Sequence, residues 1–262
     1  MSVVILRDEI IHYEVLGRGR PVIFLHDWVG SWRYWIPSMQ AASVSFRAYA
    51  LDLWGFGDTA KNPTFYSHEQ QLSLLREFLD ELGIGKIAVV GHGFGAILSL
   101  LFASQYPHAA DRIMAIGLPR QENALHPRLR SSSPTELAEW LMERTPATEA
   151  AWMEACKADP RAIALSLVSI QNLNLPALPR QVSVPCLLVE GQNDPVFEGY
   201  QRTDEETLPE QMHCIVFDNS GHYPMLDEPA KFNRLLSDFL SLASGESPRR
   251  LQLKEEWKRR VR

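Results

Sequence analysis

The sequence has 262 residues, 45% of them hydrophobic and 22% charged, which is typical of a globular chain and excludes global disorder, collagen and coiled coil. No apolar run approaches the roughly 18 residues that a membrane-spanning helix requires, so we expect no span. The first residues lack the basic, apolar and small-residue parts of a signal peptide, which predicts a cytoplasmic protein.

Charge and cysteine content narrow the classes of partner. From Gly245 onward seven Lys/Arg face three Glu, a net charge of +4, whereas the rest of the chain carries 19 basic and 29 acidic residues, a net charge of −10. An acidic body argues against nucleic acid as the main partner. For the basic tail (245–262) we favour a solvated or folded-back terminus over a docked helix. Three cysteines without a C-x-x-C pattern predict neither a disulfide framework nor a structural zinc.

Strand-like runs alternate with helical runs along the chain. The predicted strands are residues 10–16, 22–25, 48–53, 87–90, 113–116, 186–189 and 213–217. Residues 68–82 and 94–106 carry apolar residues at helical spacing. This alternation predicts βαβ crossovers and a mostly parallel sheet, and therefore an α/β fold.

One stretch interrupts the alternation. Between Leu118 and Pro185 there is no convincing core strand, while residues 134–144, 148–157 and 160–172 have a helical pattern. We interpret 118–185 as a helical cap inserted into a core made of 1–117 and 186–244. We expect the cap to cover the carboxyl ends of the strands, where open α/β sheets bind ligands.

Five motifs follow the predicted strands. They are His26-Asp27-Trp28-Val29-Gly30, Trp54-Gly55-Phe56-Gly57-Asp58-Thr59, Gly91-His92-Gly93-Phe94-Gly95, Gly191-Gln192-Asn193-Asp194-Pro195 and Asn219-Ser220-Gly221-His222-Tyr223-Pro224. In this order they resemble the α/β-hydrolase superfamily over residues 10–243, in particular its epoxide hydrolases, C–C hydrolases and small esterases. The resemblance implies a mostly parallel eight-stranded sheet flanked by helices, with a helical cap.

The resemblance also assigns the site, with one departure. Gly93 stands where the family's Gly-x-Ser-x-Gly elbow has its serine, so no covalent step can run through that position, and we expect open space above it. Asp194 matches the triad acid and His222 the general base, and we expect the two side chains to be within hydrogen-bond reach. We expect His92 to be buried packing.

The remaining candidates surround this position. The resemblance places an oxyanion hole at the backbone N–H groups of Trp28 and Phe94. Asp27 stands where the family usually has a glycine; it either brings negative charge to the pocket, or caps its turn or pairs with a nearby base. His26, Asp27 and Trp54 are candidates for contacts with the substrate, and Trp28 for lining an apolar pocket.

Three functions remain open at this point. The leading hypothesis is an atypical hydrolase or lyase in which the Asp194–His222 pair acts as a base on a small apolar carbonyl or ester compound. The alternatives are a ligand-binding pseudoenzyme, or a serine esterase or C–C hydrolase whose nucleophile was replaced by Gly93. Because there is no dinucleotide, P-loop or metal-ligand pattern, we expect no cofactor and no metal.

Overall fold

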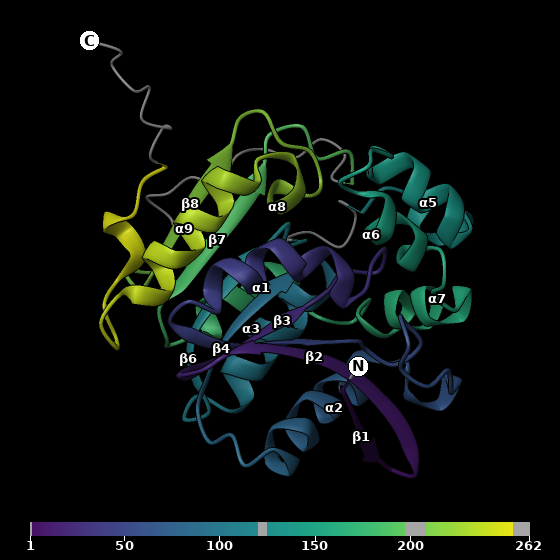
Figure 1. Cartoon of the computed structure of the whole chain (residues 1–262), viewed down its shortest axis with the longest axis horizontal. Helices are drawn as coiled ribbons and strands as arrows, with labels where there is room; N and C mark the ends of the chain where they lie inside the picture. Colours follow the sequence, from purple (N-terminus) through teal and green to yellow (C-terminus); the bar gives the residue numbers. More distant parts are fainter. Residues whose placement is uncertain (1, 120–124, 197–207, 254–262) are drawn as a thin grey trace.

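The fold is built on one twisted sheet, seen in a computed structural model that describes residues 2–119, 125–196 and 208–253 (Figure 1). The eight strands follow the order β1-β2-β4-β3-β5-β6-β7-β8 across the sheet. Their bounds are β1 (Ser2–Leu6), β2 (Glu9–Gly17), β3 (Arg20–Leu25), β4 (Phe46–Leu51), β5 (Ile87–His92), β6 (Ala110–Ile116), β7 (Cys186–Gly191) and β8 (Met212–Phe217).

Strand direction divides the sheet into two parts. β1, β2 and β4 pair antiparallel, whereas every pair from β4 through β3, β5, β6 and β7 to β8 is parallel. Parallel strands are covered on both faces, which is why Val22–Leu25 and Ile87–Val90 are continuous buried apolar runs rather than alternating ones. The predicted strands and the mostly parallel sheet are confirmed. Strand β1 was not predicted.

Helices cover both faces of the sheet (Figure 1). Helix α1 (Ile36–Ala42) packs against α9 (Pro229–Ser241), and α2 (His68–Glu81) packs against α3 (Phe94–Gln105). Helix α2 begins at the N-cap Ser67, whose side chain accepts from the backbone N–H of Gln70. Helix α3 is buried along nearly its whole length because it lies directly on β5 and β6.

The stretch 118–185 contains no strand among its described residues. Its helices are α4 (Arg128–Ser131), α5 (Pro134–Leu141), α6 (Glu149–Ala155) and α7 (Pro160–Ser169), followed by the 3-10 helix η4 (Leu175–Gln181). Helix α7 is tied to the loops that leave the sheet: the Ser166 hydroxyl accepts from the Trp28 indole N–H at 2.9 Å, and the Asp159 N–H donates to the Gly55 carbonyl at 2.9 Å. These bonds place α7 beside the carboxyl ends of β3 and β4, and a role for the whole stretch as a cap stays a prediction.

The described part of the C-terminal tail folds back onto the last strand. The Ser247 hydroxyl donates to the Glu210 carbonyl at 2.8 Å, and Arg249 donates to the Leu208 carbonyl at 2.9 Å. The most basic part of the tail, 254–262, lies outside the described residues. Among the described residues, no helix combines the length and the apolar character needed to cross a membrane.

Candidate active site

The site residues come from four loops at the carboxyl ends of parallel strands. Asp27 follows β3, Gly93 follows β5, Asp194 follows β7 and His222 follows β8. Parallel strands end at the same edge of a sheet, so residues more than 190 positions apart meet there. Asp27 and His222 are 1% and 2% exposed.

The turn at Gly93 keeps the tight geometry of a strand-to-helix elbow. Gly93 has φ +51° and ψ −109° and is the N-cap of α3. A Cβ at Gly91 would lie 2.2 Å from the Gly95 carbonyl oxygen, and one at Gly95 would lie 2.3 Å from the Leu25 carbonyl oxygen. The flanking glycines are therefore required for the close approach of β5, α3 and β3.

The expectation of open space above Gly93 is wrong, because the Asp27 side chain occupies it. An ideal Cβ at residue 93 would lie 1.9 Å from Asp27 Oδ1 and 2.1 Å from its Cγ. No side chain fits at position 93 while Asp27 holds this place. The carboxylate thus stands where the first atoms of an elbow side chain would be.

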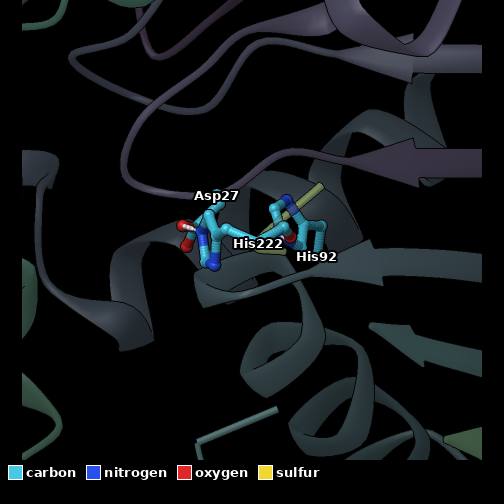
Figure 2. A group of neighbouring side chains, drawn as sticks. All are labelled: Asp27, His92 and His222. Atoms are coloured by element: carbon cyan, nitrogen blue, oxygen red, sulfur yellow. Dashed lines mark hydrogen bonds and ion pairs between the residues drawn. The ribbon is translucent and has the colours of Figure 1, made fainter. Parts of the chain in front are cut away.

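Both oxygens of the Asp27 carboxylate are hydrogen bonded. Oδ1 accepts the backbone N–H of Phe94 at 2.6 Å, and Oδ2 lies 2.9 Å from Nε2 of His222 (Figure 2). The Phe94 amide is the donor predicted for the oxyanion hole, and in this structure it already holds an anion. The role of the Trp28 amide stays a prediction.

His222 lies between two carboxylates. Its Nδ1 is 2.9 Å from Asp194 Oδ2 and 3.1 Å from Oδ1, so the predicted contact between the two side chains is present. Burial by itself lowers the pKa of His222, but the charges of Asp194 and Asp27 and the hydrogen bonds to them outweigh it and raise the pKa to about 10. Burial raises the pKa of Asp27, yet the hydrogen bond to His222 and its charge bring that pKa below its ordinary value.

These pKa shifts change the role predicted for His222. At neutral pH the imidazole is protonated and donates from both nitrogens, so in this arrangement it is an acid and not a free base. A pair of Asp194 and His222 acting alone as the base does not fit the geometry. The ionised group at the apex of the site is the carboxylate of Asp27.

The two other predicted substrate contacts are buried in the protein. His26 Nδ1 lies 2.7 Å from the Asp27 carbonyl and its Nε2 accepts the Leu53 N–H at 3.0 Å, so neither ring nitrogen is left for a ligand. This side chain joins the loops after β3 and β4, and a contact between His26 and substrate stays a prediction. Trp54 is also buried and packs against Phe65, and its contact with a ligand stays a prediction.

His92 has a role that its sequence position did not indicate. Its Nδ1 is 3.1 Å from the Tyr34 hydroxyl and its Nε2 is 2.9 Å from the His222 carbonyl oxygen. Tyr34 was not predicted for the site, and no motif marks it. The alternative that Asp27 pairs with a nearby base is confirmed by its contact with His222. Its place above Gly93 was not predicted, although the acid in place of glycine at 27 and the glycine in place of serine at 93 compensate each other in space.

Asp27, His92 and His222 lie close enough to be considered as metal ligands. Both ring nitrogens of His92 are used by Tyr34 and by the His222 carbonyl, so this set offers a cation two free ligand atoms at most. Structural and catalytic zinc sites use at least three protein ligands. The arrangement fits an ion pair better than a metal centre.

Comparisons with known proteins agree with the fold. A family model described as "Alpha/beta hydrolase family" matches residues 22–235. A 2-hydroxy-6-oxo-2,4-heptadienoate hydrolase from Pseudomonas putida is 27% identical over 257 residues, covering 86% of this chain and 91% of that enzyme.

Two further similarities support less, because one covers under half of each chain and the other has low sequence identity. A soluble epoxide hydrolase from Corynebacterium sp. (strain C12) is 31% identical over 108 residues, which is 41% of this chain and only 38% of that enzyme. An esterase from Exiguobacterium antarcticum superposes with a TM-score of 0.79 at 18% identity, over 92% of this chain and 99% of that one. The last similarity concerns the fold alone.

Proposed function

Since the chain belongs to the α/β-hydrolase family, we propose that it is a hydrolase in which Asp27 supplies the nucleophilic oxygen that Gly93 lacks. The observation that carries this proposal is the position of the carboxylate, whose Oδ1 would lie 1.9 Å from a Cβ at residue 93. The substrate class is a small apolar compound whose saturated carbon carries an oxygen leaving group, namely an epoxide. The named relatives that hydrolyse epoxides and C–C bonds support hydrolysis as the reaction type.

The first step forms a bond between enzyme and substrate. An oxygen of the ionised Asp27 attacks the electrophilic carbon, the carbon–oxygen bond to the leaving group breaks, and the substrate is held on Asp27 as an ester. The leaving oxygen takes its proton from protonated His222. The raised pKa of His222 fits this step, because the proton is present at neutral pH.

The second step restores the enzyme. His222, now neutral and oriented by Asp194, takes a proton from water, and the oxygen of that water attacks the carbonyl carbon of the Asp27 ester. The Phe94 N–H, which already holds Oδ1 at 2.6 Å, stabilises the negative charge on that oxygen. Collapse of the intermediate releases the product with one oxygen from Asp27 and leaves Asp27 with one oxygen from water.

The test determines where the oxygen of water is found after one turnover. Enzyme in excess is allowed one turnover of styrene oxide in ¹⁸O-labelled water, and the peptide containing Asp27 is then weighed by mass spectrometry. We expect one ¹⁸O in Asp27 and unlabelled oxygen in the product. Asp27→Asn is the matched control, because it keeps the side chain's size and removes its charge; we expect it to lose at least about 100-fold in rate. Product formed without label in Asp27, or full activity in Asp27→Asn, would refute the carboxylate nucleophile.

A second candidate is a binding protein without turnover. The observation that favours it is burial, because Asp27 and His222 are together almost wholly covered. A buried ion pair of this kind can simply be structural. Binding of styrene oxide or of p-nitrophenyl acetate seen by calorimetry, with no product after long incubation, would support this candidate over hydrolysis.

A further inference from the structure

A line of hydrogen bonds runs beneath the ion pair, through two side chains that the reaction above does not use. The backbone N–H of Asp27 donates to the Tyr34 hydroxyl at 2.9 Å. That hydroxyl lies 3.1 Å from His92 Nδ1, and His92 Nε2 lies 2.9 Å from the backbone carbonyl of His222. The line therefore begins and ends on the main chain of the two residues whose side chains form the ion pair.

The direction of each bond in this line is fixed by its ends. A carbonyl oxygen only accepts, so His92 Nε2 carries the proton and donates to His222. His92 Nδ1 is then an acceptor, and the Tyr34 hydroxyl donates to it while accepting from Asp27. Burial and the charge of His222 lower the pKa of His92 to about 4, so His92 is neutral at pH 7, as this arrangement needs.

Together with the ion pair between Asp27 and His222, this line of hydrogen bonds forms a closed ring. One half of the ring is the contact between the Asp27 and His222 side chains, 2.9 Å long. The other half is Tyr34 and His92, which set the separation of the two backbones. From this geometry we infer that Tyr34 and His92 are positioning residues, which hold the loop after β3 and the loop after β8 at the distance that lets Asp27 meet His222 above Gly93.

Packing restricts the movement of the Tyr34 and His92 side chains. Tyr34 and His92 are buried, and the Tyr34 ring lies edge-on to those of His92 and Tyr223, with centroids 5.8 and 5.5 Å away. A Cβ at Gly30 would lie 2.3 Å from the Tyr34 ring, so this ring rests directly on the backbone of the loop that carries Asp27. A ring held on several sides transmits the position of one loop to the other.

The same cluster contains a matched control. The Tyr223 hydroxyl donates to the Val29 carbonyl at 2.5 Å, so Tyr223 also joins the two loops but takes no part in the line between Asp27 and His222. Tyr34→Phe and Tyr223→Phe each remove one buried hydroxyl from one cluster. They differ in whether the backbone N–H of Asp27 loses its acceptor.

The experiment measures the pKa of His222 by NMR titration of its imidazole carbons in the whole chain. In Tyr34→Phe we expect the pKa of His222 to fall by at least about one pH unit, because the Asp27 carboxylate is no longer held against it. We expect the same fall in His92→Phe, and no larger fall in the double variant, since both side chains belong to one line. Tyr223→Phe should leave the pKa of His222 unchanged.

Two outcomes would overturn the inference. One is a pKa of His222 that is unchanged in Tyr34→Phe; the other is an equal fall in Tyr34→Phe and Tyr223→Phe, which would indicate a general effect of packing. The importance of the link for turnover rests on the proposed function, but the titration does not require turnover. Activity that survives in Asp27→Asn would therefore refute the nucleophile and leave the positioning result standing.

Discussion

Replacing Gly93 with serine should damage the site instead of restoring a serine hydrolase. The family pattern suggests that Gly93→Ser would complete a triad with His222 and Asp194. In this structure the new Cβ would lie 1.9 Å from Asp27 Oδ1, so the carboxylate must leave its place. We expect no burst of p-nitrophenolate from p-nitrophenyl acetate in this variant.

Two effects set how much stability Gly93→Ser should lose. A non-glycine residue at φ +51° is strained by about 1–3 kcal/mol. Displacing Asp27 breaks its buried ion pair with His222, which costs about 3–5 kcal/mol. We therefore expect Gly93→Ser to lower the free energy of unfolding by at least about 4 kcal/mol, measured by urea denaturation.

The double variant Asp27→Gly/Gly93→Ser separates the two effects. With the carboxylate removed, the serine introduced at position 93 keeps the strain but meets no obstacle. Because the ion pair is then lost once and not twice, the two substitutions should cost about 3–5 kcal/mol less together than the sum of the single variants. The space next to His222 Nε2 then holds a hydroxyl, and we expect a burst that disappears when His222→Ala is added. The reasoning is refuted if Gly93→Ser alone unfolds within about 1 kcal/mol of the unchanged chain, or if the double-mutant cycle shows no coupling.

Three further outcomes follow from the described contacts. Because the pKa of His222 is raised, its contribution to stability is fully present below pH 6.5 and is lost as pH rises through about 10. The free energy of unfolding in urea should therefore fall over that pH range, and less so in Asp27→Asn. An equal fall in both proteins would contradict the raised pKa. Gly30→Ala should cost about 1–3 kcal/mol by pushing the Tyr34 ring away, and a thermal midpoint equal to that of the unchanged chain would show that the ring can yield. Arg112→Met should cost about 2–3 kcal/mol, because the buried guanidinium donates to carbonyls at the end of α9; unfolding in urea measures this loss, and an unchanged midpoint would argue that water replaces the guanidinium.

The fold could be predicted from the sequence because its signals are local. Buried parallel strands such as 87–90 are continuous apolar runs, and the glycines around residue 93 mark a tight turn whatever lies above it. Strand β1 escaped notice since Ser2–Leu6 is a short run at the edge of the sheet with Val3 and Ile5 exposed. Edge strands of this kind lack the burial that makes an inner strand readable.

The site was predicted only in part, because some of its contacts are not local in the sequence. Asp194 and His222 were found because each follows a strand in a fixed motif. The place of Asp27 depends on a side chain reaching across from one loop to the apex of another, which no spacing along the chain encodes. Tyr34 belongs to no motif. His92 was predicted to be buried packing because its side chain should point away from the apex of the turn, and its hydrogen bonds to a hydroxyl and to a backbone carbonyl are seen only in the structure.

The fit of Asp27 over Gly93 restricts the order in which this site can have arisen from one with an elbow serine. While a side chain stands at position 93 the acid has no room, so the glycine must come first and the acid second. The intermediate would hold glycine at both positions, with no nucleophile and an unoccupied amide at Phe94. Homologous chains should accordingly carry an acid at position 27 only together with a glycine at position 93, and an acid beside a serine should be selected against.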